Sequence, residues 1–377
     1  TSRNEKAGVK KYTVYNRTLI PTIFKSLEED YFHLTNNVQL WDVTCQKIIQ
    51  IKGQEAINLV RYLFCRDLTQ VSPGKAYYAP IVNFKGGLLN DPVIFCIKED
   101  CFWVSIADSD LYNWISAINE MKEFKVQVTL PEVYTMAVQG PKSLELLTKI
   151  FSKKIHELKF FNFKKFVFNQ DSIFISKTGF SKQSGFELLV SNFDTGISLW
   201  DLIMEQGKDL NIRVGCPNMI ERVESNLLSY GNEMNDSDNP YECGLGKFCN
   251  LETDYDFIGK QSLLKKRSIG FKKSIYRVEF DNISEEKEPF YSSLPVLYKN
   301  TEIGKATSIV WSPKYSKYIG FLISNRKIEQ TINDHYIANE KQTSFMVSEI
   351  LRSLNVRFKI CCHWSNRIRL CWSSTCC

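Results

Sequence analysis

The apolar and polar positions of the chain switch repeatedly between the alternation of strands and the helical period of about 3.6 residues. Residues 46–53 predict a strand that ends at Gly53, and residues 54–68 predict the amphipathic helix that follows it. The same order returns in residues 133–151, where a Gly-Pro pair closes a strand before a second helix. The pattern therefore predicts two α+β units, related by a weak internal duplication.

Further along, the pattern predicts additional helices and a region rich in strands. Residues 19–34 have the apolar spacing of a helix, and so do residues 218–234. Short strand signals then crowd residues 266–324, which predicts a small β-rich third domain. We divide the chain accordingly: residues 1–135 and 136–265 together form the α+β body, and residues 266–324 form the third domain.

Residues 325–377 differ in character from the rest of the chain. They contain no Gly or Pro, although folded domains normally mark their turns with these residues. The segment ends in a mixture of Cys, Trp and Arg that follows no helix or strand period. We interpret it as an anomalous tail from a shifted reading frame, with a divergent natural extension as the alternative. We expect it to pack poorly and to contribute nothing to a functional site.

Composition narrows the classes of function. The 377 residues carry a net charge of +6 without a Lys/Arg block interleaved with aromatics, which favours a small-molecule substrate over nucleic acid. No apolar run reaches the roughly 18 residues that cross a bilayer, and the N-terminus lacks a signal peptide's apolar core, so we expect no membrane partner and a cytoplasmic location. The 12 cysteines show no CxxC spacing, which predicts reduced thiols and no metal site. The sequence leaves open whether the protein forms a homodimer.

The stretch NFKGGLLNDPVIF, residues 83–95, combines turn residues with an amide and a carboxylate. Gly86 and Gly87 predict a hairpin turn, because glycine tolerates the positive φ that such turns need. Asn90 and Asp91 are then expected at the start of the returning strand. Turn chemistry alone explains these residue types. The functional alternative is a carboxylate that a rigid turn holds toward a ligand.

Six motifs between residues 9 and 324 occur in the order seen in one enzyme family. They are NFKGGLLNDPVIF, AVQGPKSLELL, SGFELLV, IERVESNLLSYGNEM, FIGKQSL and GKATSIVWSPKYSKYIGF. Together they resemble the folate-dependent aminomethyltransferase family, which includes the T-protein of the glycine cleavage system. Six more are similar to its dimethylsulfoniopropionate-demethylating branch: GVKKYTVYN, DYFHLTNNVQLWDV, VSIADSDL, GFSKQSGFE, GCPNMIER and DNPYECGL. Typical T-proteins carry a second aspartate where Asn90 stands and Asn-Ala after the Val-Ser of VSIAD, so both departures favour the demethylating branch.

The resemblance implies an α+β fold of three domains packed in a ring, with tetrahydrofolate as the cofactor at its centre. Carried over by motif, Asp91 is the catalytic carboxylate, and Asn90 lies beside it in the folate site. Glu187 is implied to bind the pterin edge, with Arg222 near the pterin and Trp103 against the folate. The structural alternatives are an edge-strand charge for Glu187, a helix ion pair for Arg222 and ordinary core packing for Trp103.

The resemblance also implies a substrate and a reaction. Aromatic faces attract a sulfonium cation, which makes Tyr15 and Phe180 candidates for substrate binding, while Lys182 would pair with the substrate carboxylate. A methyl group would move from dimethylsulfoniopropionate to tetrahydrofolate, giving 5-methyltetrahydrofolate and methylmercaptopropionate. Two alternatives stay open: aminomethyl transfer of the glycine cleavage type, and a folate-binding scaffold without turnover.

Overall fold

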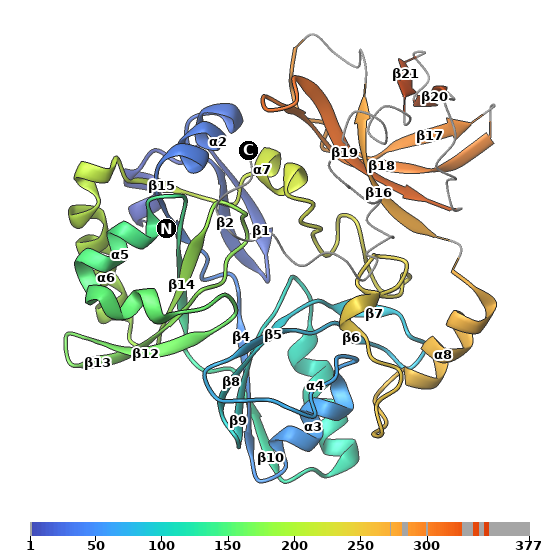
Figure 1. The fold of residues 1–377 in the computed structure, drawn as a ribbon, viewed down its shortest axis with the longest axis horizontal. Helices are drawn as coiled ribbons and strands as arrows, with labels where there is room; N and C mark the ends of the chain where they lie inside the picture. The colour runs from blue at the N-terminus through green and yellow to red at the C-terminus, as the bar shows by residue number, and fades with distance from the viewer. Residues whose placement is uncertain are drawn as a thin grey trace.

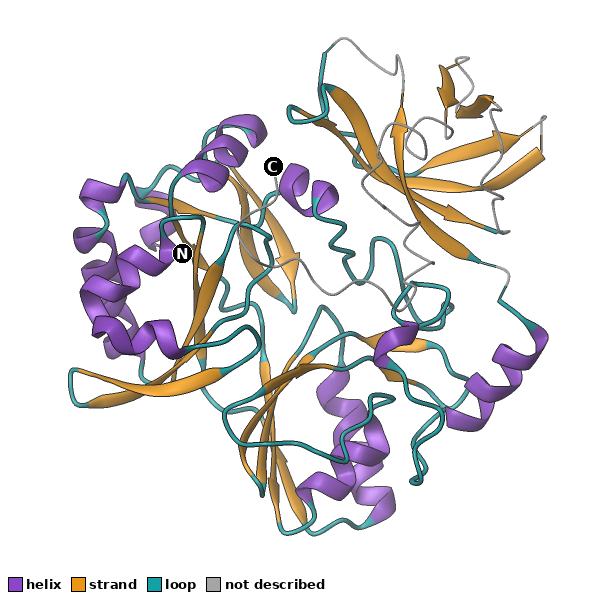
Figure 2. Cartoon of the chain, viewed as in Figure 1, coloured by secondary structure: helices purple, strands orange, loops and turns teal. Residues whose placement is uncertain are grey.

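The computed structural model describes residues 2–271, 273–280, 286–298, 301–325, 335–338 and 343–346. In this part of the chain, three sheet-centred units are grouped around a common centre (Figure 1). Helices accompany the two units built from the first two thirds of the chain, whereas the C-terminal unit is almost entirely strand (Figure 2). The α+β architecture with a β-rich third unit agrees with the fold predicted from the sequence.

The first unit is a five-stranded sheet built from one continuous stretch of chain, with helices α3 (Ala56–Leu63) and α4 (Leu111–Lys122) packed on it. Its strands follow the order β10 (Val126–Thr129), β4 (Ile48–Gly53), β9 (Cys101–Ser105), β8 (Val93–Lys98) and β5 (Ala76–Tyr78). A small separate hairpin, β6 (Ile81–Val82) with β7 (Leu88–Asn90), interrupts the sequence between β5 and β8. The predicted strand and helix of residues 46–68 are both present.

The second unit is a six-stranded sheet with helices α5 (Ser143–Phe151) and α6 (Phe193–Gln206) packed on it. The order is β12 (Phe163–Phe168), β13 (Asp171–Ser176), β14 (Gly185–Val190), β11 (Tyr134–Gln139), β3 (Gln39–Asp42) and β15 (Arg213–Gly215). The short 3₁₀ turns η1 (Ser152–Glu157) and η2 (Lys208–Leu210) follow the two helices.

Strand β3 belongs to the second unit, although the predicted division at residue 135 assigned it to the first. It pairs antiparallel with β11 and parallel with β15, so it completes the second sheet although it precedes every strand of the first. Its Leu40 and Trp41 are buried, which explains why this short strand is held in the middle of a sheet. The first sheet is thus an insertion between two neighbouring strands of the second.

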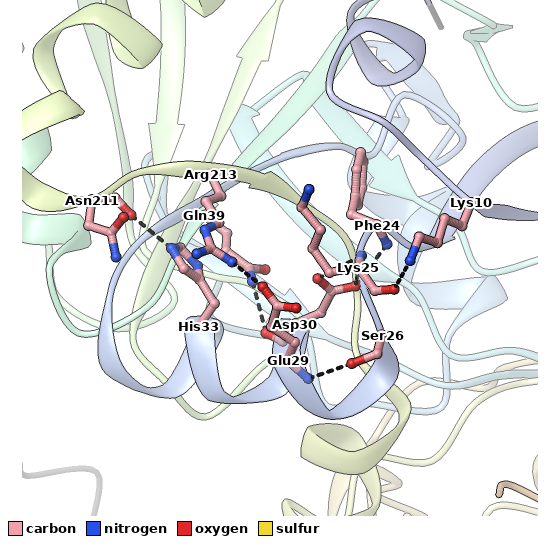
Figure 3. Close-up of polar contacts among 10 residues, drawn as sticks. All are labelled: Lys10, Phe24, Lys25, Ser26, Glu29, Asp30, His33, Gln39, Asn211 and Arg213. Atoms are coloured by element: carbon pink, nitrogen blue, oxygen red, sulfur yellow. Dashed lines mark hydrogen bonds and ion pairs between the residues drawn. The ribbon is translucent and has the colours of Figure 1, made fainter.

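Helix α2 (Leu27–Asn36) is fixed to the second sheet at both ends (Figure 3). At its start the Ser26 hydroxyl accepts a backbone N–H of the first turn at 3.0 Å, and the Asp30 carbonyl accepts a 3.0 Å bond from the Gln39 amide on β3. At its end the His33 ring nitrogen Nε2 lies 2.8 Å from the Asn211 carbonyl oxygen, just before β15. Burial lowers the pKa of His33, so the ring is neutral at physiological pH and donates this bond.

The N-terminal segment contains a strand where the sequence predicted a helix. Helix α1 (Ser2–Lys6) leads into an antiparallel pair, β1 (Lys11–Tyr15) and β2 (Thr18–Ile23). Residues 19–34 were predicted as one helix, but only the part from Leu27 is helical. Asn16 and Arg17 both have positive φ and form the tight turn between the strands, and this turn commits the following residues to β2.

The third unit is a six-stranded sheet that extends past the predicted boundary at residue 324. Its order is β16 (Ser274–Phe280), β19 (Lys317–Ser324), β18 (Thr301–Ser312), β17 (Leu294–Tyr298), β20 (His335–Ala338) and β21 (Thr343–Met346). Strands β20 and β21 fall in the segment that we expected to pack poorly, and β20 pairs with β17. The remainder of that segment, residues 326–334, 339–342 and 347–377, lies outside the described residues.

A central hydrophobic cluster joins the three units. It combines Tyr31 of α2 and Leu88 of β7 with Phe321 of β19, so side chains from each unit pack together. The connecting elements α7 (Met219–Glu224), the 3₁₀ turn η3 (Gly246–Phe248) and α8 (Lys260–Ile269) run between the second and third units. None of the helices that the structure describes has the length and apolar character needed to span a bilayer.

Candidate functional site

One large cavity of about 3160 Å³ opens at the centre of the molecule and is lined from all three units, for example by Ala76, Glu187 and Thr307. Pockets for a single small ligand rarely exceed about 1,000 Å³, so this cavity has room for two ligands. Most of the residues predicted for the site line it: Tyr15, Asp91, Phe180, Lys182, Glu187 and Arg222. Asn90 and Trp103 lie outside the lining.

Asp91 occupies the link between β7 and β8, facing the cavity. The Gly-Gly hairpin returns earlier than we predicted: its second strand is β7, and the carboxylate follows that strand instead of beginning the next. A Cβ atom at Gly87 would come within 2.0 Å of the Asp236 carbonyl oxygen, so this turn requires glycine. The Tyr78 hydroxyl on β5 donates a 2.7 Å bond to the carboxylate. Burial, partly offset by this bond, raises the pKa of Asp91 to about 7.

Asn90 is fully buried and holds a neighbouring loop in place. Its amide nitrogen donates to the Ala107 carbonyl at 3.0 Å and to the Ser109 hydroxyl at 2.8 Å, and its oxygen accepts the Ala107 N–H at 3.0 Å. The structure therefore places Asn90 behind the cavity wall, as a support for the loop between β9 and α4. This differs from the predicted role in the folate site, because its polar atoms already have protein partners.

Glu187 projects from β14 into the cavity lining, as expected for a residue that binds the cofactor. Among the described residues, only the Thr178 hydroxyl donates a hydrogen bond to its carboxylate. Burial raises the pKa of Glu187, and the Thr178 bond opposes that change. The other carboxylate oxygen of Glu187 is thus available to accept a hydrogen bond from an N–H group in the cavity.

Arg222, on α7, lines the cavity but is held by protein groups. Its guanidinium forms a buried ion pair with Glu233, at 3.1 and 3.3 Å, and donates to the Ser308 hydroxyl on β18 at 2.5 Å. The structural alternative offered by the sequence was a helix ion pair with Glu221 or a neighbouring acid. The partner is Glu233 instead, 11 residues beyond Arg222 in the sequence. Arg222 therefore fastens α7 to the third unit at the cavity wall.

Trp103 belongs to the packing between the first two sheets. It is almost fully buried, and its ring lies edge-on to Phe174 with the ring centres 5.4 Å apart. The indole N–H donates to the Gln50 side-chain oxygen at 3.1 Å. Of the two interpretations offered by the sequence, the structure matches ordinary core packing, and Trp103 does not reach the cavity.

The three residues predicted to bind the substrate all line the cavity. Tyr15 ends β1, and burial, followed by the charge of Asp91, raises the pKa of its hydroxyl well above the usual value. Phe180 is half-buried and Lys182 is exposed, and both belong to the loop between β13 and β14. An aromatic face and a cation are therefore presented to the cavity by one short segment.

Two further residues shape this site and were missed in the sequence. Tyr78 holds the Asp91 carboxylate, and Glu221 is a buried carboxylate beneath the loop that carries Phe180. Tyr78 stood in a strand of aromatic residues, where core packing was a sufficient explanation. Glu221 looked like the exposed member of a helix charge pair. Neither partner is close in sequence, so no local pattern could reveal these contacts.

Comparison with known proteins agrees with this architecture. The GCVT N-terminal domain family model matches residues 2–253. The chain is 40% identical over 311 residues to dimethylsulfoniopropionate demethylase DmdA of Ruegeria pomeroyi, covering 82% of this chain and 84% of the relative. It is 30% identical to an aminomethyltransferase of Bdellovibrio bacteriovorus, covering 80% and 83%. The crystal structure of glycine cleavage system aminomethyltransferase T from Bartonella henselae aligns with a TM-score of 0.79 at 19% identity, covering 92% of this chain and 95% of that one.

The chain therefore belongs to the aminomethyltransferase family defined by the GCVT N-terminal domain. The structural alignment shows the shared fold of that family. Enzymes of this family use tetrahydrofolate, so the predicted family, enzyme class and cofactor are confirmed.

Proposed function

We propose that the protein transfers a methyl group from a sulfonium donor, dimethylsulfoniopropionate, to tetrahydrofolate. The products are 5-methyltetrahydrofolate and methylmercaptopropionate. The observation that carries the proposal is that the β7–β8 link offers the cavity a single carboxylate, Asp91, while the side chain of Asn90 is occupied by Ala107 and Ser109. The similarity to the Ruegeria pomeroyi demethylase supports the same reaction.

The residues of the cavity fit a reduced folate. Glu187 offers a carboxylate with spare acceptor capacity, which suits the parallel N–H donors of an aminopyrimidine edge. Asp91 lies elsewhere in the lining, fixed by Tyr78. Tetrahydrofolate, when bound, supplies the amine nitrogen that receives the methyl group. In this proposal Glu187 holds the pterin and Asp91 faces the reacting amine.

The proposed methyl transfer requires a proton acceptor but no general acid. The carbon–sulfur bond breaks with its electron pair left on sulfur, so the donor departs as a neutral thioether without protonation. Asp91 would take up the N–H proton that the accepting amine gives up as the new bond forms. A carboxyl group with a pKa of about 7 suits a proton acceptor at neutral pH, because both protonation states are then populated.

The donor would be recognised as a zwitterion. The faces of Tyr15 and Phe180 would attract the sulfonium, a cation that offers no hydrogen bond. Lys182 would attract the carboxylate at the other end. Placing donor and acceptor together in a cavity shielded from water is then the main contribution to rate.

One assay tests the proposal against aminomethyl transfer, the alternative that the Bdellovibrio bacteriovorus relative supports. The protein is incubated with tetrahydrofolate and dimethylsulfoniopropionate carrying deuterated methyl groups, and folates are analysed by mass spectrometry. We expect deuterated 5-methyltetrahydrofolate in amounts equal to methylmercaptopropionate. A second reaction contains an aminomethyl-lipoyl donor instead. Methylenetetrahydrofolate and ammonia from that reaction, without methyl product in the first, would overturn the proposal.

A further inference from the structure

The loop of residues 177–184, which joins β13 to β14, carries both Phe180 and Lys182. It contains glycine and polar residues and has no regular structure, so its position depends on side-chain contacts from outside. At its start, the Thr178 hydroxyl bonds the carboxylate of Glu187. The start of the loop is therefore held by Glu187, and residues 181–183 need a separate support.

Glu221 holds the loop from below. It is 1% exposed, and its Oε1 atom accepts the Lys182 backbone N–H at 2.8 Å and the Gln183 side-chain amide at 3.1 Å. The same oxygen accepts the Ser225 hydroxyl at 2.7 Å, which orients the carboxylate from its own helix. Hydrogen bonds to a carboxylate are stronger than those between neutral groups, so this contact is suited to fixing a flexible segment.

The helix that carries Glu221 is itself immobilised. On α7, the next residue is Arg222, which is paired with Glu233. At the helix end, Glu224 accepts the Tyr31 hydroxyl at 2.9 Å and the Ser312 hydroxyl at 2.5 Å, from α2 and β18. Glu221 thus extends from a support that is bound to the second and third units at once.

A second contact fixes the opposite side of the loop. The Ser181 hydroxyl donates to the Gln139 side-chain oxygen at 2.8 Å. Cβ atoms at Gly179 and Gly185 would come within 2.2 and 2.3 Å of the Gln139 amide nitrogen, so the Gln139 side chain lies directly against the backbone of both glycines. Gln139 and Glu221 therefore hold residues 181–183 between them.

From these contacts we infer that Glu221 is a positioning residue for the methyl donor: it holds Phe180 and Lys182 in the arrangement that binds the sulfonium and the carboxylate. The inference rests on the proposed function for the identity of the ligand. Glu221 does not line the cavity, so it acts through the loop and not through contact with the donor.

Three variants and a control test this role. Glu221→Ala removes the acceptor, Glu221→Gln keeps the oxygen that receives the loop N–H, and Gln183→Ala removes one donor only. Glu205→Ala, which changes an exposed glutamate paired with Lys208, is the matched control. We expect Glu221→Ala to raise KM for dimethylsulfoniopropionate about tenfold, as for the loss of one charge-assisted bond, with little change in kcat or in the affinity for tetrahydrofolate. Glu221→Gln should recover most of this loss, and Gln183→Ala should give a smaller increase.

Amide hydrogen exchange reports on the anchor without any turnover. The Lys182 N–H should exchange faster in Glu221→Ala than in the wild type, and close to the wild-type rate in Glu221→Gln and Glu205→Ala. Unchanged exchange at Lys182, or equal effects of Glu221→Ala on both substrates, would overturn the inference. If the wild type shows no methyl transfer from this donor, the proposed function fails, whereas the exchange experiment still decides whether Glu221 anchors the loop.

Discussion

Replacing Asp91 by asparagine should remove activity and at the same time stabilise the folded protein. Burial raises the pKa of this carboxyl group from 3.8 to about 7. Between these two pH values the folded state binds a proton that the unfolded state has lost, so the free energy of unfolding falls as the pH rises. A pKa difference of one unit changes the free energy of unfolding by about 1.4 kcal/mol. The difference of about three units therefore lowers the free energy of unfolding by about 4 kcal/mol above pH 7.

Asparagine has nearly the same shape, and its oxygen still accepts the bond from the Tyr78 hydroxyl. Asp91→Asn should therefore gain up to about 4 kcal/mol at about pH 8 and almost nothing at about pH 4, where the wild-type group is already protonated. Turnover should fall about 100-fold or more because the proton acceptor is lost. In the wild type, methyl transfer should decline as the pH falls below about 7, as expected if the carboxylate is the active form.

The measurements are urea unfolding of both proteins across this pH range and initial rates of methyl transfer. Tyr78→Phe serves as a control, because it removes the bond to the carboxylate while leaving the carboxylate in place. Equal stability of wild type and Asp91→Asn at about pH 8 would refute the argument from burial. Near-normal turnover of the variant would refute the role of Asp91 as proton acceptor.

The other predictions concern the cofactor site and its supports. Glu187→Ala should weaken tetrahydrofolate binding by about 2 kcal/mol in calorimetry without altering the affinity for the sulfonium, and an unchanged folate affinity would exclude the assigned role. Asn90→Asp should cost about 3 kcal/mol in chemical denaturation, because a buried carboxylate would face the Ala107 carbonyl; a fully stable variant would contradict this. Trp103→Phe should lose about 1 kcal/mol through the missing bond to Gln50 and leave folate affinity intact. Weaker folate binding by the Trp103→Phe variant would show that Trp103 takes part in the folate site after all.

The predicted site residues Asp91 and Glu187 line the cavity, and their motifs also fix their surroundings, while their roles stay predictions. Both follow short turns and strands whose geometry is local. Trp103 and Asn90 lie outside the lining, because strand position alone does not say which face meets another sheet and which meets a ligand. The helix predicted over residues 19–34 failed for a related reason: apolar residues of β2 continue the spacing of α2, and the turn before them was not recognised.

The position of β3 has a consequence for synthesis. As the nascent chain leaves the ribosome, residues 39–42 emerge before any partner strand, and β11 follows only after the whole first sheet. That sheet is contiguous in sequence and can close on its own, whereas β3 waits with both edges unpaired until β11 has been made. Its second edge stays open until Gly215 of β15 has been made. The second unit should therefore be the later of the two to fold. During this interval the exposed strand is where chaperone binding or mispairing between nascent chains would begin.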